Sequence, residues 1–516
     1  MGARSLLISG YGLPMRKGLS LVALAVVGSL SLASCSSEQP TVAVPSPVFT
    51  PAIASNLEAY YKQPVKWTDC GGASCTKVKV PLDYQNPSNG STTLAVTKLA
   101  ATGDSQGALF VNPGGPGGSG FDYAKSARQA LSESVNEHFD IIGVDPRGVS
   151  KSDPVTCLTD RQQDVLAASN SNPQTPAEVI AIQALSKIPS VGCVKYASPR
   201  YEFVSTENVA RDFDIVRAVV KNESFNFLGK SYGTSIGARY AQLFPDRVGR
   251  MVLDGVLPVE LDLAAVTKGQ ASGFEEAFRH FSADCGSHDD CPYAGNTSQV
   301  ASKIRNFIQG LDASPLKVGS RNLNTSLASS AVLSYLYFPA KDYPKLRSAL
   351  DDAVNSHKGA SLLALLDNRT GRQENGHYAD NSTAAFYAVT CLDRQYAGTV
   401  ADVGSLAKQW QTTTPTFGPS LAWGMLSCSN WPATGPKPTQ SLAFEDTAPV
   451  LVVATSHDPA TPAFWAKKLA GQLPQSALLT WDAYNHTAYR QGSGCIDTAV
   501  DTYLLRGTVP SANLKC

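Results

Sequence analysis

The chain has 516 residues, 43% of them hydrophobic, so it can bury a large core and hold one large domain with an insertion, or two domains. Its 43 lysines and arginines balance 43 aspartates and glutamates, and no basic block stands out. This composition argues against a wholly disordered chain, and it lacks the basic footprint that nucleic-acid binding requires.

The first forty residues have the features of an export signal. Met15-Arg16-Lys17 supplies positive charge, and the apolar stretch Leu19 to Leu32 is too short to favour a permanent membrane span. The stretch leads into Leu32-Ala33-Ser34-Cys35, which resembles a bacterial lipobox. We therefore expect residues 1–35 to be a lipoprotein signal peptide that leaves Cys35 lipidated, followed by a tether over residues 36–55. An ordinary cleaved signal with an incidental cysteine is the alternative.

The remaining cysteines favour disulfide bonds. Setting Cys35 aside leaves ten, an even number in a chain that carries an export signal. A metal site is not favoured, because no C-x-x-C occurs and no cysteine lies beside a histidine at zinc-ligand spacing. We expect neither a metal nor another cofactor. Spacing alone does not fix the connectivity, but neighbours along the chain could pair as Cys70 with Cys75, Cys157 with Cys193, Cys285 with Cys291, Cys391 with Cys428, and Cys495 with Cys516.

Strand and helix patterns alternate through the first half of the chain. Two apolar runs, Ala108–Val111 and Asp140–Val144, each stop at a loop rich in glycine and proline and are typical of buried strands. Apolar residues at helical spacing predict a helix from Thr206 to Val220, with Thr206 as its N-cap. A strand over 225–228, a helix over 231–243 and a strand over 250–253 follow. This alternation predicts a mostly parallel, doubly wound sheet with helices on both faces.

The alternation breaks down from about Leu257 to about Val403, where the sequence is helical and rich in loops. We expect residues 257–403 to form an inserted, mainly helical cap domain. The α/β pattern resumes with a strand over 449–454, a helix over 462–473 and a strand over 477–481. Residues 56–256 and 404–516 are therefore expected to be the two parts of one α/β domain.

The motif Gly229-Lys230-Ser231-Tyr232-Gly233 matches G-x-S-x-G between a predicted strand and a predicted helix. This is the context of the nucleophile elbow in α/β hydrolases, where a sharp turn exposes the serine. The helix start behind the serine favours negative charge that develops in the transition state. A glycine-rich helix start without chemistry is the alternative. The context predicts the α/β-hydrolase fold, with Ser231 as the nucleophile.

The base and the acid follow by elimination, because this fold uses the chain order Ser, then Asp or Glu, then His. Only His457 and His486 lie late enough, and His457 immediately precedes Asp458, so no acid from that strand end could come before it. We expect His486 to be the general base and Asp458 to hold its imidazole. Asp482 is the alternative acid, and surface loop positions are the alternative for both residues.

The segment Asn112–Gly120, with the sequence NPGGPGGSG, follows an early strand, where this fold keeps half of its oxyanion hole. The backbone N–H of Tyr232 would supply one donor, and Gly115 is the best candidate for the other.

The same segment formally fits the dinucleotide-binding fingerprint G-x-G-x-x-G, with Asp140 about twenty residues further on. We reject that interpretation for three reasons. Pro113 and Pro116 remove N–H donors, Asp140 begins its strand where the ribose-binding acid should end one, and an exported lipoprotein has little access to NAD.

Taken together, these residues resemble the secreted actinobacterial tripeptidyl aminopeptidases, which are relatives of prolyl aminopeptidase among the α/β-hydrolase serine peptidases. The resemblance implies release of short peptides, often tripeptides, from a free N-terminus through an acyl-enzyme, with the cap bounding the amino end of the substrate. It covers nearly all of the mature chain, and its carriers are Asn112–Gly120, Asp145–Gly148, Gly229–Thr234, Asp458–Pro462 and the tail Cys495–Cys516.

The resemblance also implies two supporting roles. Thr461 would support the acid, since a hydroxyl three residues after Asp458 could donate to that carboxylate. Exopeptidase action needs an acidic cap residue to hold the substrate ammonium, for which Asp393 is a candidate. Glu275 and Glu276 are alternatives, and an ordinary salt bridge explains such residues equally well. One departure from the family is Asn485-His486-Thr487, where relatives often have Gly-His-Gly.

The expected function is that of an aminopeptidase held at the outer face of the membrane by a lipid on Cys35, with peptides or proteins as substrates. An esterase or lipase on the same scaffold would share the triad, because fold and triad do not fix the acyl substrate. A glycine loop with Pro116 rather than an H-G-G-G run favours the peptidase. A non-catalytic binding lipoprotein is the third hypothesis.

Overall fold

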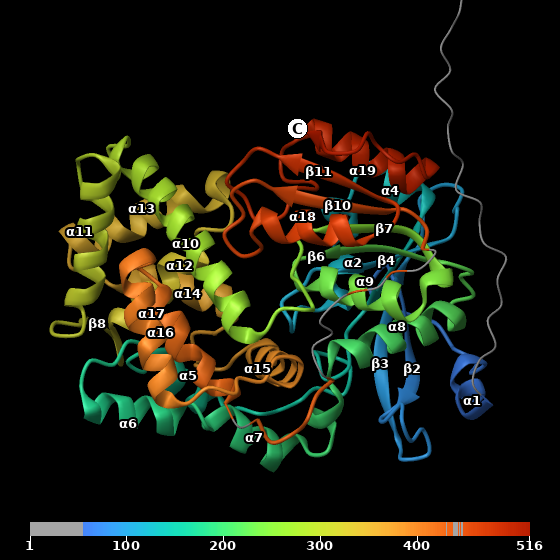
Figure 1. Cartoon of the computed structure of the whole chain (residues 1–516), viewed down its shortest axis with the longest axis horizontal. Coiled ribbons are helices and arrows are strands. Elements are labelled where there is room, and N and C mark those ends of the chain that lie inside the picture. Colours follow the sequence, from blue (N-terminus) through green and yellow to red (C-terminus); the bar gives the residue numbers. More distant parts are fainter. Residues whose placement is uncertain (1–54, 430, 437–441, 443, 445–446) are drawn as a thin grey trace, which may run out of the picture. The chain divides into compact units, whose positions relative to one another are not determined.

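The computed structural model describes residues 55–516, except 430, 437–441, 443 and 445–446. The expected signal peptide, its Cys35 and all but the last residue of the expected tether lie outside the described residues. A ten-stranded sheet organises the described chain (Figure 1). In spatial order its strands are β1 (Thr68–Asp69), β2 (Ser74–Pro81), β3 (Ser91–Leu99), β5 (Asp140–Val144), β4 (Ala108–Asn112), β6 (Phe225–Lys230), β7 (Val248–Asp254), β10 (Val450–Thr455), β11 (Ser476–Trp481) and β12 (Leu514–Lys515).

The strands from β5 through β4, β6, β7, β10 and β11 to β12 are all parallel, and β1, β2 and β3 form an antiparallel edge that joins β5. Every residue of β4 and of β10 is buried. Strands buried on both faces are expected when helices cover the sheet on both sides. The carboxyl ends of β6, β7 and β10 therefore lie next to one another at one edge of the sheet, where ligands bind in open α/β sheets.

Two hydrophobic cores cover the two faces of the sheet. Phe110 of β4 and Phe225 of β6 belong to one core, whereas Leu109 and Val111 of β4 belong to the other, as the alternation of side chains along a strand requires. Helices α8 (Thr206–Val219), α9 (Tyr232–Leu243) and α18 (Ala463–Gln472) contribute to the first core. The second core includes residues of α2 (Gly120–Lys125), α3 (Ala127–Ala130), α4 (Glu133–His138) and α19 (Gly494–Arg506). The short helix α1 (Glu58–Tyr61) contacts α8 and β2.

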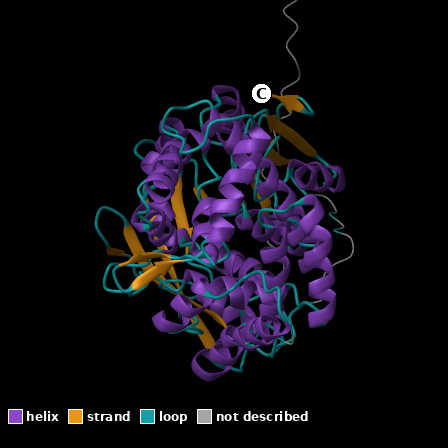
Figure 2. Cartoon of the chain, turned by 90° about the vertical axis from the view of Figure 1, so that its left-hand side faces the viewer, coloured by secondary structure: helices purple, strands orange, loops and turns teal. Residues whose placement is uncertain are grey.

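A helical region interrupts the sheet between β7 and β10 and has a core of its own, with Phe278, Ile304 and Leu346 among its buried residues. Figure 2 shows how strongly helices dominate this side of the molecule. The region contains α10 (Leu263–Gly286), α11 (Thr297–Gly310), the hairpin of β8 (Leu316–Val318) and β9 (Arg321–Leu323), α12 (Thr325–Ser334), α13 (Pro339–Asn355), α14 (Ala360–Thr370), α15 (Ser382–Asp393), α16 (Val400–Thr413) and α17 (Gly418–Gly424).

The extent of this region differs from the expected boundaries. Helix α16 crosses position 403, and α17 continues the helical region and packs on α10, so the sheet resumes only at β10. A further helical excursion between β5 and α8 also contacts the region, through α5 with α12 and α7 with α15. Its helices are α5 (Asp160–Ala168), α6 (Pro176–Leu185) and α7 (Ile188–Ala197). Amphipathic helices carry no sequence signal for the unit on which they pack, so packing alone decides these limits.

The molecule has the α/β-hydrolase fold with a helical insertion, which confirms the expected fold class. The strands and helices predicted around the nucleophile and after the insertion are present within about two residues of the predicted ends. All five expected disulfide pairs are present. Five disulfides are typical of a protein outside the reducing cytoplasm.

The prediction that Thr206 caps α8 is wrong. Ser205 is the N-cap, because its side chain accepts the backbone N–H of Asn208, and Thr206 is the first residue of the helix. The hydroxyl of Thr206 is thereby free for a contact outside the helix.

Candidate active site

The candidate nucleophile lies on a sharp turn between β6 and α9. Ser231 has φ 54° and ψ −124°, a backbone conformation that costs energy for a residue with a side chain. A Cβ atom at Gly229 would lie 2.6 Å from the carbonyl oxygen of Gly233, and one at Gly233 would lie 2.8 Å from that of Asn112. Both glycines of the motif are therefore required by close backbone packing, which is how the local sequence builds the elbow.

Asp458 and His486 form a buried pair just past the carboxyl ends of β10 and β11. Nδ1 of His486 lies 2.8 Å from Oδ1 and 3.0 Å from Oδ2 of Asp458. The carboxylate also accepts backbone N–H groups from Ala460 at 2.9 Å, Thr461 at 2.8 Å and Thr487 at 3.0 Å. Because an ionised carboxylate only accepts hydrogen bonds, Nδ1 carries the proton and Nε2 is left as an acceptor. This is the tautomer that a general base needs.

Thr461 contacts both members of the pair. Its backbone N–H donates to Asp458, whereas its hydroxyl lies 3.4 Å from Nδ1 of His486. The expected donation from the hydroxyl to the carboxylate is thus replaced by donation from the backbone. The reason is local, since an aspartate at the start of a turn accepts the N–H groups two and three residues further on.

A loop after β11, residues 485–489, carries His486 and is called the base loop below. Lys230 donates from Nζ to the carbonyl oxygen of Tyr489 at 2.6 Å. The carboxylate of Asp254 accepts the backbone N–H groups of Ala488 at 2.9 Å and Tyr489 at 3.0 Å. The ends of β6 and β7 therefore hold the base loop directly.

The same strand ends hold the candidate nucleophile, because the backbone N–H of Ser231 donates to the carbonyl oxygen of Asp254 at 2.9 Å. Within the described residues the ends of β6 and β7 link the elbow to the base loop, whereas no hydrogen bond joins Oγ of Ser231 to the imidazole of His486. Such bonds are often long in free enzymes and form only with substrate. Sequence reasoning missed Lys230 and Asp254, although a lysine and an aspartate that each end an apolar strand were a usable signal.

The helical insertion also contacts His486, the candidate base. The backbone N–H of His486 donates to the carbonyl oxygen of Tyr337 at 2.8 Å, and the two rings meet edge to face with centroids 5.2 Å apart. Burial, followed by the nearby charge of Asp458, raises the pKa of Tyr337 to about 12, so its phenol stays protonated. No sequence pattern indicated this contact, because Tyr337 lies in the connection between α12 and α13.

The two candidate oxyanion donors lie on either side of the elbow. The N–H of Gly114 is engaged by Oδ1 of Asn112 at 3.0 Å, whereas the N–H groups of Gly115 and Tyr232 meet no acceptor within the described residues. A Cβ atom at Gly114 would lie 3.0 Å from the backbone nitrogen of Tyr232. The glycine loop thus packs directly against the elbow.

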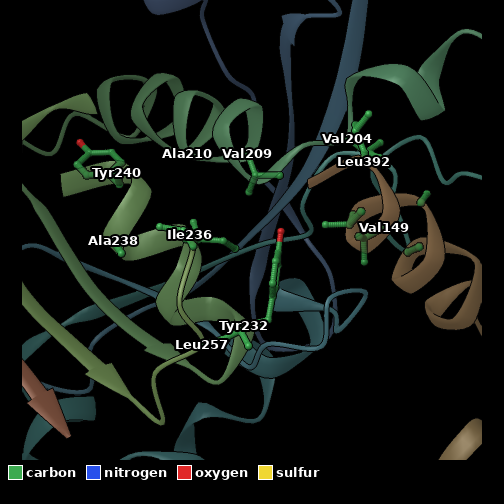
Figure 3. Close-up of a cluster of buried hydrophobic side chains, with 14 of the residues drawn as sticks. Val149, Val204, Val209, Ala210, Tyr232, Ile236, Ala238, Tyr240, Leu257 and Leu392 are labelled. Atoms are coloured by element: carbon green, nitrogen blue, oxygen red, sulfur yellow. The ribbon is translucent and has the colours of Figure 1, made fainter. Parts of the chain in front are cut away.

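A cavity of about 240 Å³ lies beside these donors, and both Gly115 and Tyr232 line it. Figure 3 shows the ring of Tyr232 extending from the start of α9 among buried apolar side chains. Helices α10, α15 and α17 of the insertion form other parts of the wall. The apolar lining includes Leu257, Leu263, Val266, Phe386, Val389, Leu421 and Met425.

Asp393 is the candidate acid that lines this cavity. Its carboxylate accepts the backbone N–H of Thr206 at 2.9 Å and also the hydroxyl of Thr206, which lies 2.8 Å from the phenol oxygen of Tyr232. Burial raises the pKa of Asp393. A carboxylate offers about four acceptor positions, so Thr206 leaves part of Asp393 able to accept from another donor.

The other acidic candidates are engaged away from the cavity. Buried Glu275 accepts the backbone N–H of Thr416 at 2.9 Å. Glu276 is bound to Nδ1 of His457 at 2.6 Å, and the exposed alternative acid Asp482 lies 3.7 Å from Nε2 of the same histidine. Neither Glu275 nor Glu276 lines the cavity, and Asp482 is paired with the histidine that was rejected as the base.

Comparisons with known proteins agree on one family. The family model described as TAP-like protein matches residues 414–516. The chain is 34% identical over 484 residues to the serine protease Hip1 of Mycobacterium tuberculosis, covering 88% of this chain and 91% of that protein. It is 34% identical over 457 residues to carboxylesterase B of the same organism, with 86% of each covered. It is 29% identical over 471 residues to the tripeptidyl aminopeptidase of Streptomyces coelicolor, covering 88% and 86%.

Proposed function

Because the chain belongs to the TAP-like family of α/β hydrolases and is a serine hydrolase, we propose that it is an aminopeptidase that releases short peptides from free N-termini. The observation that carries the proposal is the cavity that holds a carboxylate, Asp393, and both oxyanion candidates, Gly115 and Tyr232. A substrate seated there has its scissile carbonyl at one end and its amino group at the other.

In the proposed reaction Ser231 attacks the scissile carbonyl while Nε2 of His486 takes its proton. Asp458 holds the imidazole in the required tautomer and stabilises the imidazolium. The N–H groups of Gly115 and Tyr232 receive the oxyanion, which costs little reorganisation because the elbow holds them in place. His486 then gives the proton to the leaving amine, and water hydrolyses the acyl-enzyme by the same steps.

Asp393 would bind the substrate ammonium. Its charge is costly where it lies, as the raised pKa indicates, and an ammonium would relieve that cost on binding. An apolar lining beside it favours substrates with apolar side chains near the scissile bond.

An esterase is the second candidate function. The relative named carboxylesterase B and the mostly apolar wall of the cavity both favour it. The two candidates differ in what Asp393 does, because an uncharged acyl ester has no ammonium to meet a carboxylate.

The test compares four chromogenic substrates: a tripeptidyl amide with a free amino group, its N-acetylated form, an aminoacyl amide and a short acyl ester. We expect the free tripeptidyl amide to have the highest kcat/KM and N-acetylation to remove most of it. Turnover of esters alone would instead support the esterase. The Ser231→Ala variant is the control, and failure of a fluorophosphonate to label Ser231 in the folded wild type would favour a non-catalytic binding protein.

We also propose that Cys35 carries a lipid that holds the enzyme at the cell envelope. The lipobox-like sequence and the five disulfides support an extracytoplasmic location. Cys35→Ala should move the protein from the membrane fraction to the medium. Retention of the variant in the membrane fraction would contradict a lipid anchor at this position.

A further inference from the structure

A buried ion pair lies directly beside the nucleophile elbow. Lys230 precedes Ser231 at the end of β6, and Asp254 ends the neighbouring strand β7. Nζ of Lys230 lies 3.7 Å from Oδ2 of Asp254, with side-chain exposures of 10% and 0%. Burying two charges is expensive, and an apolar pair of similar size often stabilises a protein as well or better. The pair therefore calls for a reason other than stability.

The groups that the pair binds supply such a reason. Lys230 donates to the carbonyl oxygen of Tyr489, and Asp254 accepts the N–H groups of Ala488 and Tyr489. Both residues of the pair therefore bind the backbone of Ala488 and Tyr489, which lie two and three positions after His486. Lys230 and Tyr489 are 259 positions apart, so their hydrogen bond is a long-range tertiary contact and does not belong to the local structure of the elbow.

The other end of the attachment is the nucleophile. Lys230 is bonded to Ser231 through the chain, and the carbonyl oxygen of Asp254 accepts the N–H of Ser231. The next residue links this site to β10, the strand that leads to Asp458, because the backbone N–H of Gly255 donates to the carbonyl oxygen of Val453. The ion pair is thus the point at which the three chain segments of the proposed triad meet.

Asp254 also acts electrostatically on the base. Burial raises the pKa of Asp254, and the nearby charges of Lys230 and His486 oppose that rise. The other polar groups that face His486 are Asp458, the hydroxyl of Thr461 and the partly buried Tyr337.

We propose that Lys230 and Asp254 form a clamp that positions His486 against Ser231, a role that rests on the proposed serine-hydrolase reaction. Neither residue lines the substrate cavity, so both are positioning residues. Their loss should lower kcat and leave KM nearly unchanged, because the binding surface is intact while the reacting groups are displaced. A misplacement of about 1 Å costs on the order of 100-fold in rate.

The test uses Lys230→Met, Asp254→Asn and the uncharged double variant K230M/D254N. The matched control is Asp212→Asn. Asp212 forms a similarly buried ion pair with Arg147, with side-chain exposures of 1% for Asp212 and 2% for Arg147, and within the described residues it has no hydrogen bond to the base loop. We expect kcat for the tripeptidyl amide to fall about 100-fold in K230M/D254N and not in D212N. In the single variants kcat should also fall while KM stays close to the wild-type value.

The design separates the clamp from a merely structural pair. If K230M/D254N and D212N lower Tm alike while kcat and KM stay at the wild-type values, the clamp proposal is overturned. If a single variant does not fold, the double variant still decides, since it leaves no unpaired buried charge. Failure of the proposed reaction would look different, because the wild type itself would then not be labelled at Ser231.

Discussion

Replacing Asp393 with asparagine is the most direct test of the proposed substrate. The change keeps the size of the side chain and one oxygen for Thr206, but it removes the charge that an ammonium would meet. Truncating one partner of a buried, hydrogen-bonded charge pair costs about 2–5 kcal/mol. At 1.36 kcal/mol per tenfold, that corresponds to a loss of about 30- to 5,000-fold in kcat/KM for substrates with a free amino group.

The assay measures kcat/KM for the free tripeptidyl amide, its N-acetylated form and an acyl ester. In D393N only the kcat/KM for the free amide should fall. Glu275→Gln and Glu276→Gln are matched controls, since both remove an acidic charge from α10 outside the cavity. They should leave the preference for free amino groups as it is in the wild type.

Stability provides an independent check on the same variant. Because burial raises the pKa of Asp393, its ionised form is less stable in the folded chain than in the unfolded chain at neutral pH. Removing the charge should therefore not lower Tm at pH 7. Equal losses for all three substrates, or an undiminished rate on the free amide, would refute the reasoning.

Three further predictions concern the proposed triad and its surroundings. Asp458→Asn should lower kcat about 10⁴-fold without a matching rise in KM, because the imidazole loses its tautomer while the cavity is untouched; steady-state kinetics measure both. Gly114→Ala would bring a Cβ atom within 2.6 Å of the carbonyl oxygen of Lys230, at φ 98°, and should weaken fluorophosphonate labelling; wild-type labelling would contradict the tight packing. Burial, the largest cause, lowers the pKa of His280, so the unfolded chain binds its proton more readily and stability is lost as pH falls below about 6.5. His280→Phe keeps a ring against Tyr484 and should flatten the fall of Tm between pH 6.5 and 5, measured by thermal scans; an unchanged slope would count against the assignment.

The fold could be predicted because its signals are local. The buried strands β4 and β10 are short apolar runs that end in turn residues, and the elbow needs two glycines because its backbone packs too closely for a Cβ atom. The order Ser, Asp, His left one histidine, His486, and two aspartates, Asp458 and Asp482, to consider. His486 and Asp458 lie in a single buried hydrogen-bonded pair. Their catalytic roles stay predictions until the variants are measured.

The limits of the insertion and the partners of the site could not be predicted in the same way. A helix such as α16 has the same amphipathic pattern whichever unit it packs on, so its place depends on tertiary contacts. Thr206 has a residue type that is typical of an N-cap, but Ser205 takes that position and Thr206 binds Asp393 instead. Ser205 and Thr206 could each serve as the N-cap, and which of them does so depends on the other groups that each hydroxyl contacts in the folded protein.

The sequence by itself determined the sheet, the elbow and the identity of the candidate triad, because each depends on residues within a few positions of one another or on the order of motifs along the chain. Only the tertiary structure decided that Lys230 and Asp254 hold the base loop, that Tyr337 reaches the base and that Asp393 shares a cavity with Tyr232. These contacts join residues that lie far apart in the chain, and the type of a residue does not predict which distant residue it will contact. Their free energy depends on distance and burial, which exist only once the chain has folded.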